Sequence, residues 1–322
     1  MSSVALLSNP RSTGNRSLLP RVRSFCAEHH DIFHYEVEHA HQIGQALRTI
    51  ARVKPRVLVI NGGDGTVQAV LTELHHGGHF GDNPPPVAVL PNGKTNLIAH
   101  DLGASGDPIE ALQRVLDLSR TDIVPHIVSR ELIALTGGKA DGPPVLGMFL
   151  GGAGLADTIL YCRHKIYPLG LPNSVSHALT FLAYITRLVL KLKSGFLPQP
   201  AEQTDLELHQ HGRISGRFAF LAVTTLDKLL LSGQVVGKGL GPLKLVAIEE
   251  STGSVFRALL AGLTGGYKGK KVRGFHFEEV DEITIEGDRS NVILDGETFS
   301  AGRGSPINLT TAQPLSFVKL AA

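Results

Sequence analysis

The 322-residue sequence contains no tryptophan and only two cysteines, and aromatic residues make up 6% of it. Cys26 and Cys162 lie far apart and form no CxxC pair, so neither a disulfide framework nor a zinc site is expected. The shortage of aromatic rings weakens any proposal of base stacking, and a net charge of +2 gives no electrostatic case for nucleic acid. We therefore expect a protein of the reducing cytoplasm that binds no nucleic acid.

The sequence also lacks an apolar run of the roughly 20 residues that a transmembrane helix needs. Its first residues have no basic start and no long apolar segment, which favours a first strand over a signal peptide. The nearest candidate for a long apolar helix is 178–192. Polar residues recur there at helical spacing: His177, Thr180, Tyr184, Arg187 and Lys191. We expect a core helix of a second domain; the alternative is a helix resting on a membrane, with Arg187, Lys191 and Lys193 meeting anionic headgroups.

The first third of the sequence alternates short apolar runs with helical patterns. Strands are expected at 4–7, 33–37, 57–60 and 87–90, and helices at 17–29, 41–53, 66–75 and 109–118. Continuous apolar runs are typical of strands buried on both faces, and their alternation with helices favours a parallel sheet. Ligands of such sheets bind beyond the carboxyl ends of the strands. The loops 8–16, 61–66 and 91–96 all lie at those ends.

After about residue 122 the pattern changes to strands that glycine and proline interrupt. Strands are expected at 126–135, 216–223, 243–248 and 281–286, and a loop at 136–144. These runs predict a mainly antiparallel domain. We expect an α/β domain over 1–124 and a β-rich domain over 125–322. Whether the last strand, 315–319, folds back onto the first domain stays open.

The loop 61–66 reads Asn-Gly-Gly-Asp-Gly-Thr, follows an apolar strand and opens a helix. Free backbone N–H groups and the helix dipole favour a phosphate there, and glycines let the backbone approach it closely. Asp64 would repel a phosphate unless a cation intervenes, and Mg²⁺ binds both carboxylate and phosphate oxygens. The alternative is a tight turn in which Asp64 caps the helix.

Residues 61–66 resemble the GGDGT signature that the diacylglycerol kinase catalytic domain family shares with sphingosine kinases and NAD kinases. Residues 8–14 resemble the first-strand NPxSG loop of the lipid kinases, and 90–99 resemble their PxGTxNxxA loop. Residues 149–157 and 294–297 resemble a glycine-rich strand and the DGE motif of their second domain. Because these motifs occur in family order over nearly the whole chain, the sequence resembles the bacterial branch of that lipid kinase family.

The resemblance implies an NAD-kinase-like α/β domain, a β-sandwich-like second domain and ATP in the cleft between them. It implies Mg²⁺-dependent transfer of the γ-phosphoryl group of ATP to a lipid alcohol, with diacylglycerol as the first guess, in phospholipid biosynthesis. Asp64 would be essential, and Asp295 and Glu297 would activate the hydroxyl or organise Mg²⁺, with Asp64 and Asp295 as metal ligands. The Asp295-Gly296 pair is also a common hairpin turn. The implied nucleotide contacts are Asn9, Pro10, Arg11, Ser12, Thr13, Gly62, Gly63, Gly65, Thr66, Gly93, Lys94 and Asn96.

Three positions depart from the family pattern. Ala69 stands where a glutamate is usual, Lys94 where a threonine is usual, and Leu97 where many relatives have an acidic residue. Lys94 either neutralises phosphate charge or points into solvent. We expect an active kinase because Asp64 and both acidic residues of the 294–297 motif remain. The alternatives are a nucleotide- or lipid-binding regulator without turnover, and an NAD kinase, which does not account for the loop 8–14.

A basic cluster of Lys268, Lys270, Lys271 and Arg273 lies in the second domain. Most such clusters are solvated surface, but a lipid kinase would gain about 1 kcal/mol from each basic residue near anionic headgroups. We expect a cytoplasmic enzyme, peripheral to the membrane, that visits the bilayer transiently. The sequence leaves the lipid acceptor and the oligomeric state open, with a homodimer among the options.

Overall fold

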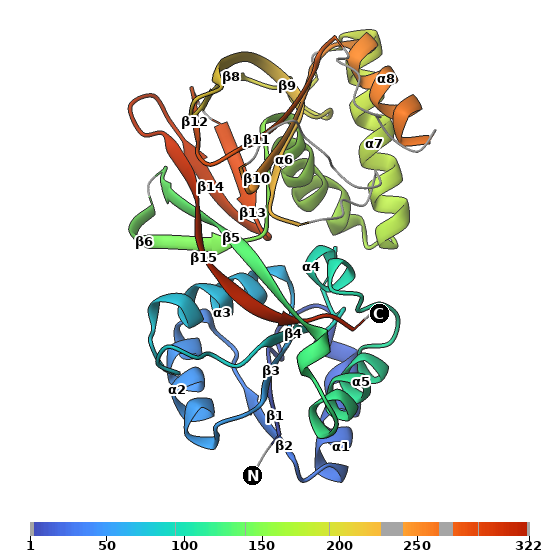
Figure 1. Cartoon of the computed structure of the whole chain (residues 1–322). Coiled ribbons are helices and arrows are strands. Elements are labelled where there is room, and N and C mark those ends of the chain that lie inside the picture. Colours follow the sequence, from blue (N-terminus) through green and yellow to red (C-terminus); the bar gives the residue numbers. More distant parts are fainter. Residues whose placement is uncertain are drawn as a thin grey trace. The chain divides into compact units, whose positions relative to one another are not determined.

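The computed structural model describes residues 3–93, 95–138, 140–192, 194–226, 241–263, 273–288 and 290–320 (Figure 1). The chain forms two compact units. Unit 1 comprises Met1–Ala134, Pro143–Met148 and Ala312–Ala322, and unit 2 comprises Leu135–Gly142 and Phe149–Thr311. The chain therefore leaves unit 1 and returns to it, so that unit 1 contains both the first and the last described residues.

Unit 1 alternates strands with helices. Its elements are β1 (Val4–Ser8), α1 (Asn15–Glu28), β2 (Ile32–Glu36), η1 (Ala40–Gln42), α2 (Ile43–Val53), β3 (Val57–Asn61), α3 (Asp64–His76), β4 (Val87–Val89), α4 (Leu97–Asp101), α5 (Pro108–Arg120) and η2 (Val124–His126). β1 pairs in parallel with β2 and β3, and β3 pairs in parallel with β4. The predicted parallel sheet is confirmed, with boundaries within about two residues of those expected from the apolar pattern.

Burial explains why the strands of unit 1 are continuous apolar runs. Every residue of β1, β3 and β4 is buried. One core cluster joins these strands to the inward faces of α1 and α5, including Val22 and Leu112. α5 begins where Asp107 accepts a hydrogen bond from the Ile109 N–H at 2.9 Å, with Pro108 at the first helical position. This packing places the loops after β1, β3 and β4 at one edge of the sheet.

The last strand, β15 (Ile307–Val318), ends in unit 1. Phe317 pairs in parallel with Val87 of β4, and Val318 is part of the core of that unit. Beyond the strand, the Lys319 N–H donates to the His126 carbonyl at 2.8 Å and the Leu320 N–H to the Leu102 carbonyl at 2.7 Å. The question that the sequence left open is thereby answered, since residues 315–319 do fold back onto the first domain.

Unit 2 is rich in antiparallel strands. Its elements are β7 (Phe149–Gly152), α6 (Ala153–Tyr161), η3 (Cys162–Ile166), η4 (Tyr167–Leu169), α7 (Asn173–Leu190), β8 (Gln203–Leu208), β9 (Gly212–Thr224), β10 (Leu243–Glu249), α8 (Thr252–Leu263), β11 (Phe275–Val280), β12 (Ile283–Gly287), β13 (Ser290–Leu294) and β14 (Glu297–Ala301). β9 pairs antiparallel with β7, β8 and β10, and β13 pairs antiparallel with β7 and β14. The antiparallel character predicted for this part of the chain is confirmed.

The prediction of a loop at 136–144 is wrong. β5 (Ile127–Gly137) is followed almost at once by β6 (Ala140–Gly147), which contains Pro143 and Pro144. Within the described part of the chain β6 pairs with β5 alone. Proline has no N–H to donate and is therefore tolerated on an edge strand, where one side of the backbone has no partner. The two prolines that suggested a loop mark an edge strand instead.

The helix expected at 178–192 exists as α7, but, unlike a typical core helix, it buries its polar side and exposes much of its apolar side. The polar side chains of Thr180, Tyr184 and Arg187 are buried, whereas Leu182 and Leu190 are about 60% exposed (61% and 60%). Arg187 forms an ion pair with Glu250, and each of the two side chains is only 7% exposed. In the alternative of a membrane helix, the contact of Arg187 with headgroups is therefore wrong, and Lys193 lies outside the described residues.

Candidate functional site

Three buried asparagines link the loops at the carboxyl edge of the sheet in unit 1. Asn92, which follows β4, donates from Nδ2 to Oδ1 of Asn15 at 2.5 Å and to Oδ1 of Asn61 at 2.7 Å. Asn15, the first residue of α1, donates in turn to the carbonyls of Asn9 at 2.8 Å and Asn61 at 3.0 Å. Asn61 ends β3 and donates to the Ser8 hydroxyl at 3.0 Å. The asparagine network, Asn15, Asn61 and Asn92, thus fixes all three loops relative to one another.

The network also explains one glycine of the first loop. A Cβ atom on Gly14 would lie 1.9 Å from Oδ1 of Asn92, a distance that no side chain can accept. The backbone at position 14 therefore passes directly against the buried amide. The sequence showed the glycine but not this reason for it.

The first loop, residues 8–14, turns around Asn9. Its Oδ1 accepts from the Arg11 N–H at 2.9 Å, and its Nδ2 donates to the Thr66 hydroxyl at 2.9 Å. The Ser12 hydroxyl is buried and has no hydrogen-bond partner among the described residues. A buried hydroxyl without a partner costs free energy, and such groups are often satisfied by a ligand or an ordered water. The loop therefore offers one polar atom that the folded protein does not use.

The second loop, residues 61–66, combines a crowded glycine with an open one. A Cβ on Gly62 would lie 2.7 Å from the Thr66 side chain, so a glycine is needed there by packing. A Cβ on Gly63 would meet no atom of the described residues within 4 Å, and its φ of −81° is accessible to any residue. Neither packing nor backbone conformation accounts for Gly63. Open space beside the N-terminus of α3 is what a phosphate group requires.

Asp64 is the first residue of α3 and does not cap it. The N-cap is Gly63, with no side-chain hydrogen bond, so the proposed capping role of Asp64 is wrong. Instead, Asp64 Oδ2 accepts from the Thr95 hydroxyl at 2.6 Å. Burial raises the pKa of Asp64 above its ordinary value, and the Thr95 hydrogen bonds and the backbone of Asp64 oppose that rise in pKa. The carboxylate is thus held at the junction of the second and third loops.

The third loop, after β4, approaches Asp64 closely. A Cβ on Gly93 would lie 3.1 Å both from Asp64 Oδ1 and from Asn96 Oδ1, and the Gly93 N–H donates to that Asn96 oxygen at 2.6 Å. Asn96 has a left-handed backbone (φ 52°), which asparagine tolerates better than most residues. Lys94, predicted to contact phosphate, lies outside the described residues.

The remaining predicted nucleotide contacts of unit 1 lie in the same loops. Arg11 is exposed, and its guanidinium lies 3.1 Å from Nε2 of His39. Thr13 is exposed, whereas Pro10 and Gly65 are half-buried. Every described residue predicted in unit 1 thus falls in the three loops. Asn15, Asn92 and Thr95 were missed, because only the folded chain shows that residues 31 to 77 positions apart share hydrogen bonds.

In unit 2, Asp295 and Gly296 form the two-residue turn of the β13–β14 hairpin. Both have positive φ, 42° and 94°, and Leu294 pairs with Glu297 across the turn. Asp295 is buried, and its Oδ1 accepts from the Phe149 N–H at 3.0 Å. Glu297 is exposed at the start of β14. The hairpin interpretation of Asp295-Gly296 is confirmed, and Asp295 stabilises the junction of β13 with β7.

A second group of charged side chains in unit 2 lies around α6 and α7. Asp157, which ends the glycine-rich motif 149–157, accepts from Asn291 Nδ2 at 3.3 Å. Burial is the main cause that raises the pKa of Asp157, and the charges of Glu202 and Glu250 add to it. Glu250 itself accepts from the Ala201 N–H at 3.1 Å besides pairing with Arg187. The carboxylates of Asp157 and Glu250 are thus both hydrogen-bonded within unit 2.

The donor set fits a nucleotide-bound Mg²⁺ better than a metal site made by the protein alone. Among the described residues no group of three or more His, Cys, Asp and Glu side chains is placed to hold a metal ion. Mg²⁺ is usually held by one or two carboxylates together with substrate phosphates and water. Asp64, the open backbone at Gly63 and the unpartnered Ser12 hydroxyl match that requirement.

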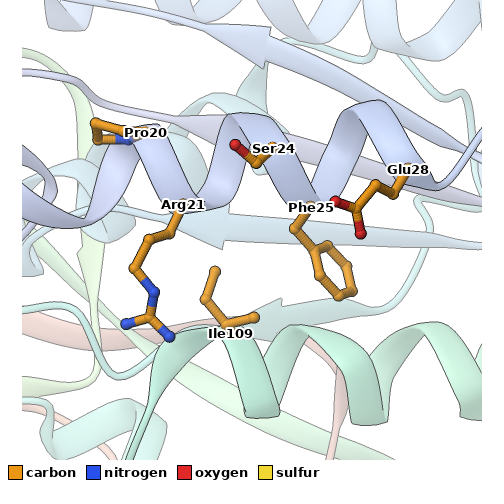
Figure 2. Close-up of a pocket in the computed structure, with 6 residues that line it drawn as sticks. All are labelled: Pro20, Arg21, Ser24, Phe25, Glu28 and Ile109. Atoms are coloured by element: carbon orange, nitrogen blue, oxygen red, sulfur yellow. The ribbon is translucent and has the colours of Figure 1, made fainter.

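A surface depression elsewhere in unit 1 carries none of this chemistry. It lies between α1 and α5 and is lined by Pro20, Arg21, Ser24, Phe25, Glu28 and Ile109 (Figure 2). In Figure 2 the Arg21 and Phe25 side chains extend toward Ile109 on the neighbouring helix. Arg21 is already paired with Asp107 at 2.7 Å. None of the three loops contributes to this depression.

The overall fold is that of known kinase structures. The crystal structure of a diacylglycerol kinase from Bacillus anthracis aligns with 99% of this chain and 97% of its own, at 15% identity and a TM-score of 0.62. Two further solved structures from the same organism, of candidate diacylglycerol kinases, align at 15% and 16% identity, each with a TM-score of 0.65. They cover 99% and 98% of this chain and 97% of their own.

The match to a protein family covers the first domain. Residues 3–124 match the model of the diacylglycerol kinase catalytic domain family, so the resemblance that the motifs indicated is confirmed over the part of the chain that carries the three loops. A search of curated proteins gives no match to this chain.

Proposed function

We propose that this protein is a lipid kinase that transfers the γ-phosphoryl group of ATP to the hydroxyl of a lipid alcohol. The observation that carries the proposal is the loop cluster of unit 1. Among the described residues, its three loops contain a buried hydroxyl without a partner (Ser12), a glycine whose Cβ position is open (Gly63) and a carboxylate that accepts from Thr95 (Asp64). Packing requires none of these three features, whereas a bound triphosphate would use each of them.

In this proposal the residues of the chain position the reactants. The N-terminus of α3 and the backbone around Gly63 bind phosphate oxygens, and the Ser12 hydroxyl donates to one of them. Asp64 would hold Mg²⁺, which would neutralise the charge that spreads over the phosphoryl group during transfer. The asparagine network holds the loops in place, so that little reorganisation is needed when the nucleotide binds.

The acceptor hydroxyl must lose a proton as the new bond forms. We assign that proton to the acidic turn of unit 2, and within it to Glu297, because Asp295 is buried and already accepts from Phe149. The original expectation did not separate the two acids. The acceptor is diacylglycerol or a similar lipid alcohol, and the enzyme visits a membrane to reach it. The same proposal includes a β-sandwich-like fold for unit 2 and an NAD-kinase-like fold for unit 1.

Two alternatives have specific motives. Ala69 and Leu97 replace acidic residues of the family pattern, which would suit a nucleotide- or lipid-binding regulator without turnover. An NAD kinase would also use the 61–66 loop. Asp64, retained and held by Thr95, favours the active lipid kinase over the regulator.

One assay with the purified full-length chain separates these functions. The protein is incubated with γ-labelled ATP and Mg²⁺, first with a lipid extract and then with NAD. Label in the organic phase supports the lipid kinase, and label on NAD supports the NAD kinase. Nucleotide binding without transfer to either acceptor supports the regulator and contradicts the proposal.

A further inference from the structure

We propose that the outward faces of α7 and α8 form a surface by which the protein docks on an anionic lipid bilayer. The inference rests on the proposed lipid-kinase function and specifies how the enzyme reaches its acceptor. No helix among the described residues has the length and apolarity to cross a bilayer, so contact through these helices would be at the surface.

The exposed apolar side chains of the described residues are gathered in one part of unit 2. Every large hydrophobic residue found exposed, apart from Val124, lies within 169–196 or 256–260. The set consists of Leu169, Leu171, Val175, Leu179, Phe181, Leu182, Val189, Leu190, Leu192, Phe196, Phe256 and Leu260. Soluble monomers rarely expose apolar patches of this extent unless the patch binds something.

The orientation of α7 makes this exposure a property of the fold. Val175, Leu179, Leu182 and Val189 recur at steps of four, three and seven, which places them on one face of the helix. The opposite face buries polar groups, with Arg187 paired to Glu250. A surface helix in water has the reverse arrangement, with its apolar stripe inward. α7 is therefore built for an apolar medium on its outer side.

α8 extends the same surface. Val255 of α8 packs in one buried cluster with Tyr184 and Leu188 of α7, and the two helices lie side by side in Figure 1. Phe256 and Leu260, four residues apart and therefore on one face, remain 51% and 64% exposed. The two helices together present one apolar docking surface.

The charges around this surface select an anionic bilayer as its partner. Residues 158–201 and 251–277 contain no aspartate or glutamate at all. The described basic side chains of Arg163, Lys165, Lys191 and Arg257 are exposed in those segments. Basic residues beside an apolar helix face are attracted to anionic headgroups. A second copy of the same basic surface would instead be repelled.

The test measures binding of the full chain to vesicles of phosphatidylcholine with and without phosphatidylglycerol. Leu182→Glu should weaken binding to the anionic vesicles at least about tenfold, because it places a charge where an apolar side chain enters the interface. The matched control is Val124→Glu, since Val124 is 69% exposed and lies in unit 1. The control should bind like the unmodified protein. The double variant Lys165→Gln with Lys191→Asn should lose the preference for phosphatidylglycerol.

Equal binding by Leu182→Glu and the unmodified protein would overturn the proposal. A second result would also overturn it: the unmodified protein sediments as a dimer without lipid, and Leu182→Glu dissociates that dimer. The apolar face would then be an interface between copies. If Leu182→Glu does not fold, the uncharged variant Leu182→Ser replaces it in the binding test. Leu182→Ser should bind anionic vesicles more weakly than the unmodified protein, and equal binding would overturn the proposal.

Activity separates this inference from the function on which it rests. Leu182→Glu should lose transfer to an acceptor embedded in vesicles but keep transfer to a dispersed short-chain diacylglycerol. If the unmodified protein phosphorylates neither acceptor while vesicle binding still depends on Leu182, the proposed function fails and the docking surface stands. If it phosphorylates both and Leu182→Glu changes neither binding nor transfer, the docking surface fails alone.

Discussion

The loop cluster of unit 1 and the acidic turn of unit 2 both carry motif residues, yet their local structure explains them to different degrees. In the turn, Asp295 and Gly296 do what a two-residue hairpin needs, and the Asp295 carboxylate bonds the neighbouring strand. In the loop cluster, neither the free space at Gly63 nor the Ser12 hydroxyl is used by the described residues, and the Asp64 carboxylate has only the Thr95 hydrogen bond beside its place in the first turn of α3. Residues that folding does not require are the better indicators of function.

The largest expected effect tests Asp64, the most informative residue of the loop cluster. If the proposed function holds, Asp64→Asn should lower phosphoryl transfer by about 1,000-fold or more, because the substitution removes the charge that would hold Mg²⁺. Activity is measured with saturating ATP and lipid. Transfer within a factor of about three of the unmodified enzyme would remove Asp64 from the mechanism.

The same substitution should lower activity without lowering the free energy of unfolding. The pKa of Asp64 is raised in the folded chain, so the folded state binds more protons than the unfolded state between the two pKa values. The free energy of unfolding therefore falls as pH rises through that window, and Asp64→Asn removes this loss. Denaturant unfolding at neutral pH should show Asp64→Asn to be no less stable than the unmodified protein.

The second prediction sharpens the comparison on the side of the acidic turn. Glu297→Gln should lower transfer by about 100-fold or more if this carboxylate accepts the proton of the acceptor hydroxyl. Because Glu297 is exposed at the start of β14, the fold should persist. Glu207→Gln, in the exposed position of another strand of unit 2, is the matched control and should leave transfer unchanged. Equal activity of the two variants would leave the turn with its hairpin role alone.

The third prediction concerns the asparagine network. Asn92→Ala leaves the side-chain oxygens of Asn15 and Asn61 buried without their donor, which should lower the free energy of unfolding by about 2 kcal/mol or more. Chemical denaturation measures the change, with the exposed Asn83→Ala as the control in the same unit. A loss below about 0.5 kcal/mol would show that the three loops do not depend on this amide.

The smallest effect separates two neighbouring glycines. Gly63→Ala should leave the free energy of unfolding nearly unchanged, because its Cβ meets open space, yet raise the Michaelis constant for ATP about tenfold by crowding a phosphate. Gly62→Ala should destabilise the fold through its clash with Thr66. An unchanged Michaelis constant for Gly63→Ala would place the nucleotide elsewhere.

The parts of the fold that depend on local pattern could be predicted from the sequence. Buried parallel strands are continuous apolar runs, so β1, β3 and β4 could be located closely. β6 could not, because Pro143 and Pro144 read as a loop unless the strand is known to lie at an edge. The orientation of α7 was also hidden, since its polar stripe turns inward, where Arg187 pairs with Glu250, 63 residues away in the sequence.

The candidate site divides in the same way. The three loops and their order follow from the motifs, and so does Asp64. The hydrogen bond from Thr95 and the asparagine network join residues far apart in the sequence, and one sequence gives no signal for such pairs. The sequence does not distinguish the two neighbouring glycines of the second loop. Only the structure shows that Gly62 is crowded by Thr66 and that Gly63 faces open space among the described residues.

The return of β15 to unit 1 has a consequence for how the chain folds during synthesis. Strands β1 to β4 of unit 1 are synthesised before unit 2, but Phe317 and Val318, which complete the sheet and core of unit 1, are synthesised after it. A nascent chain therefore carries an unfinished edge at β4 throughout the synthesis of unit 2. A chain truncated before Ala312 should be cleaved in unit 1 by protease far faster than the full chain, and equal resistance would contradict this order. Unit 1 is thus completed by a segment that the ribosome makes only after unit 2.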